Sequence, residues 1–119
     1  MKLIESLFES GRSFSLFPYR VTYKFLDQGK EKLQAGFGVS SRNFKHATDR
    51  NRIKRLSREA YRHQKQELSD LLQGKKQSLI VFFIFTGKEL PNQKFVTEKI
   101  SLILQRLVQH ANEKYPSNT

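Results

Sequence analysis

Residues 79–85 are seven apolar residues in a row, and this run constrains the fold more than any other part of the chain. Its β-branched and aromatic residues favour a strand, and a strand that is apolar on both sides is typical of the middle of a covered sheet. The run is far shorter than the roughly 20 residues that a membrane-spanning helix needs. With 119 residues in all, we expect a single domain, residues 1–119, built around this strand.

Two further strands are predicted earlier in the chain. Residues 19–25 alternate apolar side chains with polar or basic ones, which is the pattern of a half-buried strand. Residues 33–40 place apolar side chains on one face and glycines on the other. The short turn at residues 27–30 predicts that these two strands form an antiparallel hairpin. A bulge near Gly36 or Gly38 that splits the second strand is the alternative.

Three helices are predicted around these strands. Residues 2–9 have apolar side chains at helical spacing. A second, long helix begins at Thr48 or Asp49, either of which can cap its free amides. A third opens near residue 92 and gives way to a frayed tail at about residues 112–119. The order α-β-β-α-β-α predicts a two-layer α+β sandwich with a mixed sheet, since a long helix lets the central strand pair parallel with an earlier one.

The predicted middle helix separates its charges from its apolar side chains. Between Arg42 and Lys65 the chain has nine lysines and arginines against two acids, a net charge of +7, whereas the other 95 residues carry only +4. At 100° per residue, one side of the helix holds Ile53, Leu56, Ala60, Leu68 and Leu71. The opposite side, within an arc of roughly 100°, holds Asn51, Lys54, Arg55, Arg58, Arg62 and Lys65. This arrangement predicts a core on one side and a polyanionic partner on the other.

The composition limits the classes of binding partner and the kinds of catalytic or metal site that the chain can have. The formal net charge of +11 favours nucleic acid or an anionic surface. The absence of cysteine excludes disulfides, thiolate zinc sites and cysteine nucleophiles. The three histidines are scattered and the eleven acids are spread out, so no catalytic or metal-binding side chains are expected. No signal-peptide pattern opens the sequence, and we expect a soluble cytoplasmic protein.

The residues of the basic helix also carry a resemblance to a known family. Residues 50–59, which read RNRIKRLSRE, resemble the signature of the bacterial ribonuclease P protein subunit. As in that family, a glycine-rich strand at residues 36–40 and a segment at 42–47 precede the signature, and residues 7–11 resemble the end of the family's first helix. The resemblance covers residues 2 to about 110. The sequence departs from the family pattern at Ser41, where a second basic residue is common, and in a short N-terminal segment.

The resemblance implies a fold, a role and partners. The implied fold is an α+β sandwich with a left-handed βαβ crossover. The implied role is that of an RNA-binding protein cofactor of the ribozyme that removes the 5′ leader from precursor tRNA. Catalysis then resides in the RNA subunit, and Mg²⁺ is held mainly by that RNA and the substrate. The implied partners are ribonuclease P RNA and precursor tRNA with its 5′ leader, with no membrane contact and a monomeric protein.

The resemblance also assigns roles to individual residues. An aromatic cleft between the first helix and the sheet is expected to receive the leader, and it would include Phe8 and Tyr23. Packing in the core is the alternative for both rings, since aromatic side chains are mostly buried. Asn51 could likewise brace the start of the helix instead of contacting RNA. The residues expected to bind RNA are Arg42, Lys45, Arg50, Asn51, Arg52, Lys54, Arg55, Arg58 and Arg62.

Other functions stay open on the residues alone. A ribosomal protein or an rRNA-maturation factor could use the same basic helix. A protein-only nuclease would need clustered carboxylates or a histidine pair, which the sequence does not offer. An amphipathic membrane binder is disfavoured because the rest of the chain predicts a folded core.

Overall fold

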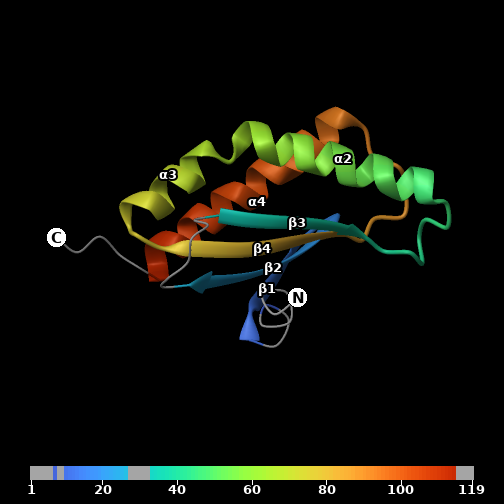
Figure 1. Cartoon of the computed structure of the whole chain (residues 1–119). Helices are drawn as coiled ribbons and strands as arrows, with labels where there is room; N and C mark the ends of the chain where they lie inside the picture. The colour runs from blue at the N-terminus through green and yellow to red at the C-terminus, as the bar shows by residue number, and fades with distance from the viewer. Residues whose placement is uncertain (1–6, 8–9, 27–32, 115–119) are drawn as a thin grey trace.

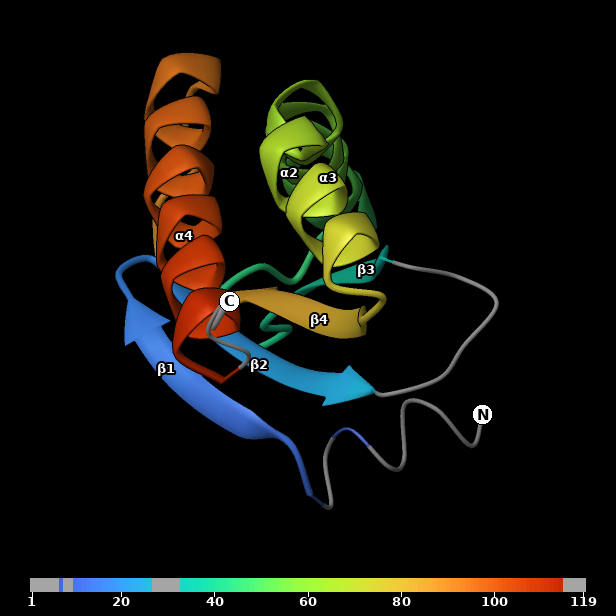
Figure 2. The same ribbon diagram turned by 90° about the vertical axis from the view of Figure 1, so that its left-hand side faces the viewer.

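The computed structural model describes residues 7, 10–26 and 33–114. In this part of the chain the elements follow in the order β1 (Arg12–Leu16), β2 (Tyr19–Leu26), β3 (Leu33–Val39), α2 (Ala47–Gln64), α3 (Gln66–Gly74), β4 (Ser78–Phe85) and α4 (Gln93–Lys114). The three helices lie on one face of the sheet (Figures 1 and 2), so the predicted two-layer α+β architecture is confirmed.

Four strands form a mixed sheet in the order β1-β2-β4-β3. β4 pairs antiparallel with β2, from Tyr19 opposite Phe85 to Leu26 opposite Ser78. It also pairs parallel with β3. The central place of β4 and its parallel partner are therefore as predicted. The predicted hairpin between residues 19–25 and 33–40 is wrong, because β4 lies between these strands. A strand that is apolar on both sides is better covered in the middle of the sheet than at its edge.

The first strand, β1, was not predicted. Its Phe14 and Leu16 alternate with serines and point to the side of the sheet that carries the helices, while Ser13 shares a 3.1 Å hydrogen bond with Thr22 on β2. A turn with a cis Phe17–Pro18 peptide bond joins β1 antiparallel to β2. The sheet thus has one strand more than expected, and β3 is continuous rather than split at a bulge.

The predicted middle helix is divided at Lys65 into α2 and α3. α2 begins at Ala47 after His46, and no side chain caps it, so the predicted caps at Thr48 and Asp49 are wrong. The Arg50 guanidinium instead donates hydrogen bonds to the carbonyls of Phe44 and Lys45, at 2.8 and 2.9 Å, and so holds the chain where it enters the helix.

The other two predicted helices are only partly tested. α4 is capped by Asn92, whose Oδ1 accepts a 2.8 Å hydrogen bond from the Phe95 N–H. It continues to Lys114, so residues 112–114 are helical and not part of a tail. The predicted helix at residues 2–9 lies outside the described residues except for Leu7, which is buried and accepts a 2.8 Å hydrogen bond from the Gly11 N–H.

The core lies between the sheet and the helices. Tyr19, Val21 and Tyr23 of β2 point into it, and the buried residues of β4, α2 and α4 that meet them include Ile53, Leu79, Val81, Phe83, Phe85, Ile100, Ile103 and Leu107. On the opposite face of β4, the Phe82 ring lies against the glycines of β3. A Cβ atom at Gly36 would be only 2.6 Å from this ring, so the close approach of ring and strand requires glycine there.

The connection from β3 through α2 and α3 to β4 joins two parallel, adjacent strands. Figure 2 views the sheet from the end at which these two strands begin. The chain leaves β3, passes above the sheet through the helices and returns to β4 on the left of β3, which makes the crossover left-handed. Such connections are right-handed in about 98% of cases, and the left-handed form is the one that the resemblance implied.

Candidate nucleic-acid interface

The two sides of α2 differ in burial as the sequence predicted. Ile53, Ser57, Ala60 and Tyr61 are buried against the sheet and α4. On the outward side, Asn51, Arg52, Arg55, Arg58 and Arg62 are exposed, and Lys54 and Lys65 are half-buried. We call this outward side of α2 the basic face. Its cations lie on a rigid helix, since the opposite side of that helix is part of the core.

The cations of the basic face keep their charge available for a partner. Among the residues that the structure describes, the one ion pair is between His110 and Glu113, 3.6 Å apart on α4. No arginine of α2 is therefore neutralised by a carboxylate of this part of the chain. A row of uncompensated positive charges on one helix attracts a polyanion.

Arg50 differs from the other arginines of the signature. It is half-buried, and its guanidinium is hydrogen-bonded to the Phe44 and Lys45 carbonyls rather than directed outward. The structure thus gives Arg50 a role in holding the start of α2, alongside the RNA contact that the resemblance implied.

The segment before α2 places two further predicted residues beside the basic face. Arg42 and Lys45 are both exposed. The segment between them is tied to the end of β4, because the Asn43 side chain donates to the carbonyls of Thr86 and Gly87, at 3.1 and 3.2 Å. This anchoring holds Arg42 and Lys45 at the N-terminal end of α2, where they extend the positive surface.

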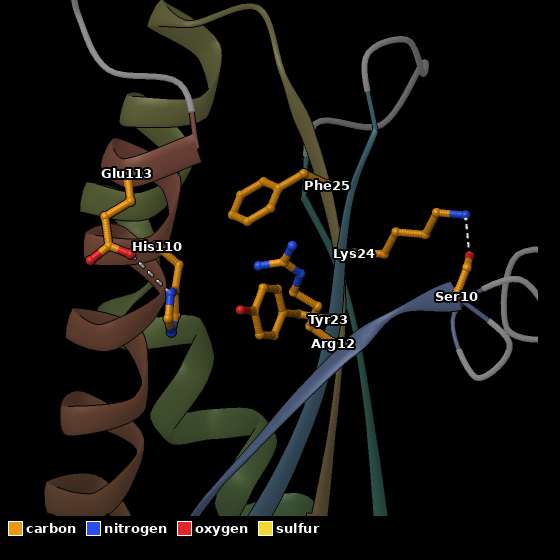
Figure 3. Close-up of a pocket in the computed structure, with 7 residues that line it drawn as sticks. All are labelled: Ser10, Arg12, Tyr23, Lys24, Phe25, His110 and Glu113. Atoms are coloured by element: carbon orange, nitrogen blue, oxygen red, sulfur yellow. Dashed lines mark hydrogen bonds and ion pairs between the residues drawn. The ribbon is translucent and has the colours of Figure 1, made fainter.

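Tyr23 lies on the side of the sheet that carries the helices. Its ring is 6% exposed and stacks on His110 of α4, with 5.3 Å between ring centroids. Burial raises the pKa of its phenol. Together with Arg12 and Phe25 it lines a cavity of about 390 Å³ between the sheet and the end of α4 (Figure 3). The role of Tyr23 in the expected leader cleft stays a prediction. Phe8, the other residue predicted for that cleft, lies outside the described residues.

The face of the sheet that α2, α3 and α4 leave uncovered carries polar side chains and the Phe82 ring. We call it the second face; from β2 it receives Arg20, Thr22 and Lys24, and from β4 it receives Phe82. Lys24 reaches the segment before β1, where its Nζ donates a 2.8 Å hydrogen bond to Ser10 Oγ (Figure 3). The alternation within residues 19–25 already separates these polar side chains from Tyr23.

The comparison with known proteins agrees with this geometry. The family model for ribonuclease P matches residues 2–108. The ribonuclease P protein component of Porphyromonas gingivalis is 32% identical over 105 residues, covering 87% of this chain and 77% of that protein. The same component of Chlorobium phaeobacteroides is 34% identical over 118 residues, covering 89% and 80% of the two chains. The chain belongs to the ribonuclease P protein family. This membership makes it the protein component of ribonuclease P and disfavours a ribosomal protein or an rRNA-maturation factor.

Solved structures of ribonuclease P proteins have the same fold. The Staphylococcus aureus protein superimposes with a TM-score of 0.67 at 18% identity, covering 89% of both chains. The Thermotoga maritima protein gives a TM-score of 0.66 at 23% identity, covering 87% of this chain and 89% of that one. At these identities the likeness concerns the fold.

Two further findings concern membrane spans and metal ligands. None of the helices in the described residues is long and apolar enough to cross a membrane. Within those same residues, histidines and acids do not come together in groups of three or more that could hold a metal ion.

Proposed function

We propose that the basic face of α2 binds the catalytic RNA of ribonuclease P. The observation that carries this proposal is the row of exposed arginines at positions 52, 55, 58 and 62, opposite a side of the same helix that is buried in the core. Each phosphate that such a side chain neutralises releases counterions, and this release supplies much of the affinity in protein–RNA complexes. Arginine suits the task better than lysine because its planar guanidinium can hold a phosphate through two hydrogen bonds.

Asn51 and Lys54 complete the proposed contact. Asn51 is neutral and exposed, and its amide can both donate to and accept from a base edge or a water molecule bound to a metal ion. Lys54 adds a point charge one turn further along the helix. Arg42 and Lys45 extend the same surface around the start of α2.

The 5′ leader of precursor tRNA is proposed to lie along the second face of the sheet. The half-buried Phe82 ring lies over the glycines of β3 on this face, and the exposed Arg20 adds a cation on the neighbouring strand. A leader is single-stranded, and its bases can stack on aromatic rings at about 1–3 kcal/mol each. Thr22 and Lys24 are closer to this path than Tyr23, which faces α4.

Mg²⁺ is proposed to be held mainly by the RNA subunit and the substrate. Hard cations of this kind prefer oxygen ligands, and they commonly combine few protein carboxylates with phosphate oxygens. The acids of α2, Asp49 and Glu59, are more than two turns apart and do not form a ligand set. The basic face would then lower the Mg²⁺ concentration that the RNA needs, because it neutralises part of the phosphate charge itself.

A reconstituted enzyme tests these proposals. Purified protein and a bacterial ribonuclease P RNA are combined, and the affinity for precursor tRNA with and without its leader is measured. We expect tighter binding of the leader-bearing substrate, and a smaller preference with Arg20→Gln, whose control is Arg55→Gln. Arg55→Gln should weaken the binding of the RNA subunit while leaving the leader preference of the assembled enzyme unchanged. Equal affinity for both substrates in the wild-type enzyme would count against the leader proposal.

A further inference from the structure

A groove runs between α2 and β3, next to the basic face. Its volume is about 250 Å³. Ala35 and Phe37 of β3 form its apolar side, since alternate residues of a strand share one face. Tyr61, Arg58 and Arg62 of α2 form the other side at helical spacing, together with Lys65 directly after that helix. The groove is below the range of about 300–1,000 Å³ that is typical of pockets for drug-sized ligands, which suits a single planar ring.

A cationic side chain lies near each aromatic ring of the groove. The Phe37 ring packs flat on Phe83 of the core, with 5.1 Å between centroids and 10° between planes. The Arg58 guanidinium lies 6.0 Å from the centroid of the Phe37 ring, and the Lys65 ammonium lies 5.8 Å from that of Tyr61. Both cations belong to long side chains on the basic face, which can turn toward phosphate and leave a ring accessible.

Two polar features open onto the same groove. Tyr61 is a buried residue. Its hydroxyl has no hydrogen-bond partner among the described residues. A fully buried hydroxyl without a partner does not occur in this part of the chain. The hydroxyl is therefore not fully buried, and Tyr61 lines the groove. β3 is also the edge strand of the sheet, so its outer backbone groups have no strand beside them in the described part of the chain. A hydroxyl and strand amides can both recognise the edge of a base.

We propose that this groove receives one unpaired base of the ribonuclease P RNA, whose flanking phosphates are held by Arg62 and Lys65. The proposal rests on the proposed function, because it extends the RNA contact of the basic face. An unpaired base combines a planar apolar face, hydrogen-bonding edges and adjacent negative charge. The groove matches these three properties with the apolar side chains of Ala35 and Phe37, the Tyr61 hydroxyl, and the cations Arg62 and Lys65. A peptide strand added to the edge of β3 would match the backbone edge alone.

The test compares binding of wild-type and variant protein to ribonuclease P RNA over a series of salt concentrations. Phe37→Leu removes the stacking surface and keeps an apolar side chain, while Ala35→Leu fills the groove without removing any contact. Both should lower the affinity about tenfold, the size expected for one stacked base. Neither should change the slope of affinity against salt, since no phosphate contact is lost. The matched control is Phe95→Leu, because Phe95 is a half-buried ring that also carries a cation, Lys99 at 5.4 Å, on another surface.

Chemical probing of the RNA gives a second readout. An unpaired base that is protected in the wild-type complex should become reactive in the complex with Ala35→Leu. Wild-type affinity for both groove variants, with Arg55→Gln still lowering the salt slope, would overturn the groove proposal and leave the basic-face proposal standing. If Arg55→Gln also has no effect, the proposed function itself fails. A groove that instead binds a peptide strand would show unchanged RNA affinity in every groove variant.

Discussion

The hydroxyl groups of Tyr19 and Ser57 lie 2.6 Å apart in the core, where they share a buried hydrogen bond between β2 and α2. Tyr19 is 1% exposed and Ser57 is 2% exposed, so neither group has water as an alternative partner. The Tyr19 ring is itself held edge-on by Phe83 and Phe85. This hydrogen bond restricts the rotation of α2 about its axis, and it therefore helps to fix the direction in which the basic face points.

Removing one partner of this hydrogen bond should be costly. Ser57→Ala leaves the Tyr19 hydroxyl buried and unpaired, and we expect the free energy of unfolding in urea to fall by about 1–3 kcal/mol. The double variant with Tyr19→Phe removes both hydroxyls and should lose less than the sum of the two single changes. A Ser57→Ala protein as stable as the wild type would mean that the hydrogen bond does not stabilise the fold.

The buried tyrosines predict a loss of stability at high pH. Burial raises the pKa of Tyr19 to about 12, from an ordinary value near 10. Burial also raises the pKa of Tyr61. Above pH 10 an unfolded chain loses the phenol proton, whereas the folded chain keeps it. The contribution of each tyrosine to the free energy of unfolding is therefore complete below pH 10 and declines as the pH rises.

For Tyr19 the free energy of unfolding should fall by about 1.4 kcal/mol per pH unit between pH 10 and 12. Urea unfolding at several pH values measures this slope. Tyr19→Phe provides the control, because it removes the titrating group and should flatten the slope, whatever other groups titrate. The same slope in both proteins would show that Tyr19 is not protected from ionisation.

Substitutions on the two sides of α2 should have opposite effects. Arg55→Gln removes an exposed charge, and we expect the slope of RNA affinity against salt to fall by about one unit with little change in stability. Ile53→Ala removes side-chain volume from a fully buried position and should lower stability by about 2–5 kcal/mol. Affinity measurements and urea unfolding on both variants check the pair. If Arg55→Gln unfolded the protein, the assignment of the two sides would be wrong.

Substitution of Arg50 and of Arg52, two arginines of the signature, should have different effects on stability. Arg50→Gln removes two hydrogen bonds to the carbonyls of Phe44 and Lys45, and we expect a stability loss of about 1–3 kcal/mol. Arg52 is exposed, so Arg52→Gln should change stability by less than about 0.5 kcal/mol. Thermal unfolding of the two variants measures this difference. Equal stability of the two would contradict the structural role that we give to Arg50.

Periodicity predicted the features that depend on a single element. The apolar run at residues 79–85 gave the central strand because a strand apolar on both sides needs neighbours on both sides. The angular separation on α2 gave the basic face, since 100° per residue places Ile53 and Arg55 on different sides. These are local patterns, and a sequence contains all of the information that they need.

Some features that depend on two or more elements were not predicted correctly. The turn at residues 27–30 favoured a hairpin, but sheet order is decided by how β2, β3 and β4 share the core. The serines of β1 gave it a weak apolar face, and its pairing with β2 supplies the stability that its own residues lack. Tyr23 stacks on His110 of α4, a contact between two elements that strand periodicity alone does not specify.

The most direct test of the basic face is processing of precursor tRNA by the reconstituted enzyme at an Mg²⁺ concentration too low for the RNA subunit alone. The wild-type protein should restore removal of the 5′ leader. The triple variant with glutamine at positions 52, 55 and 62 should fold normally yet require much more protein for the same rate, because fewer phosphates are neutralised. Full activity of the triple variant at the wild-type protein concentration would contradict our account of α2.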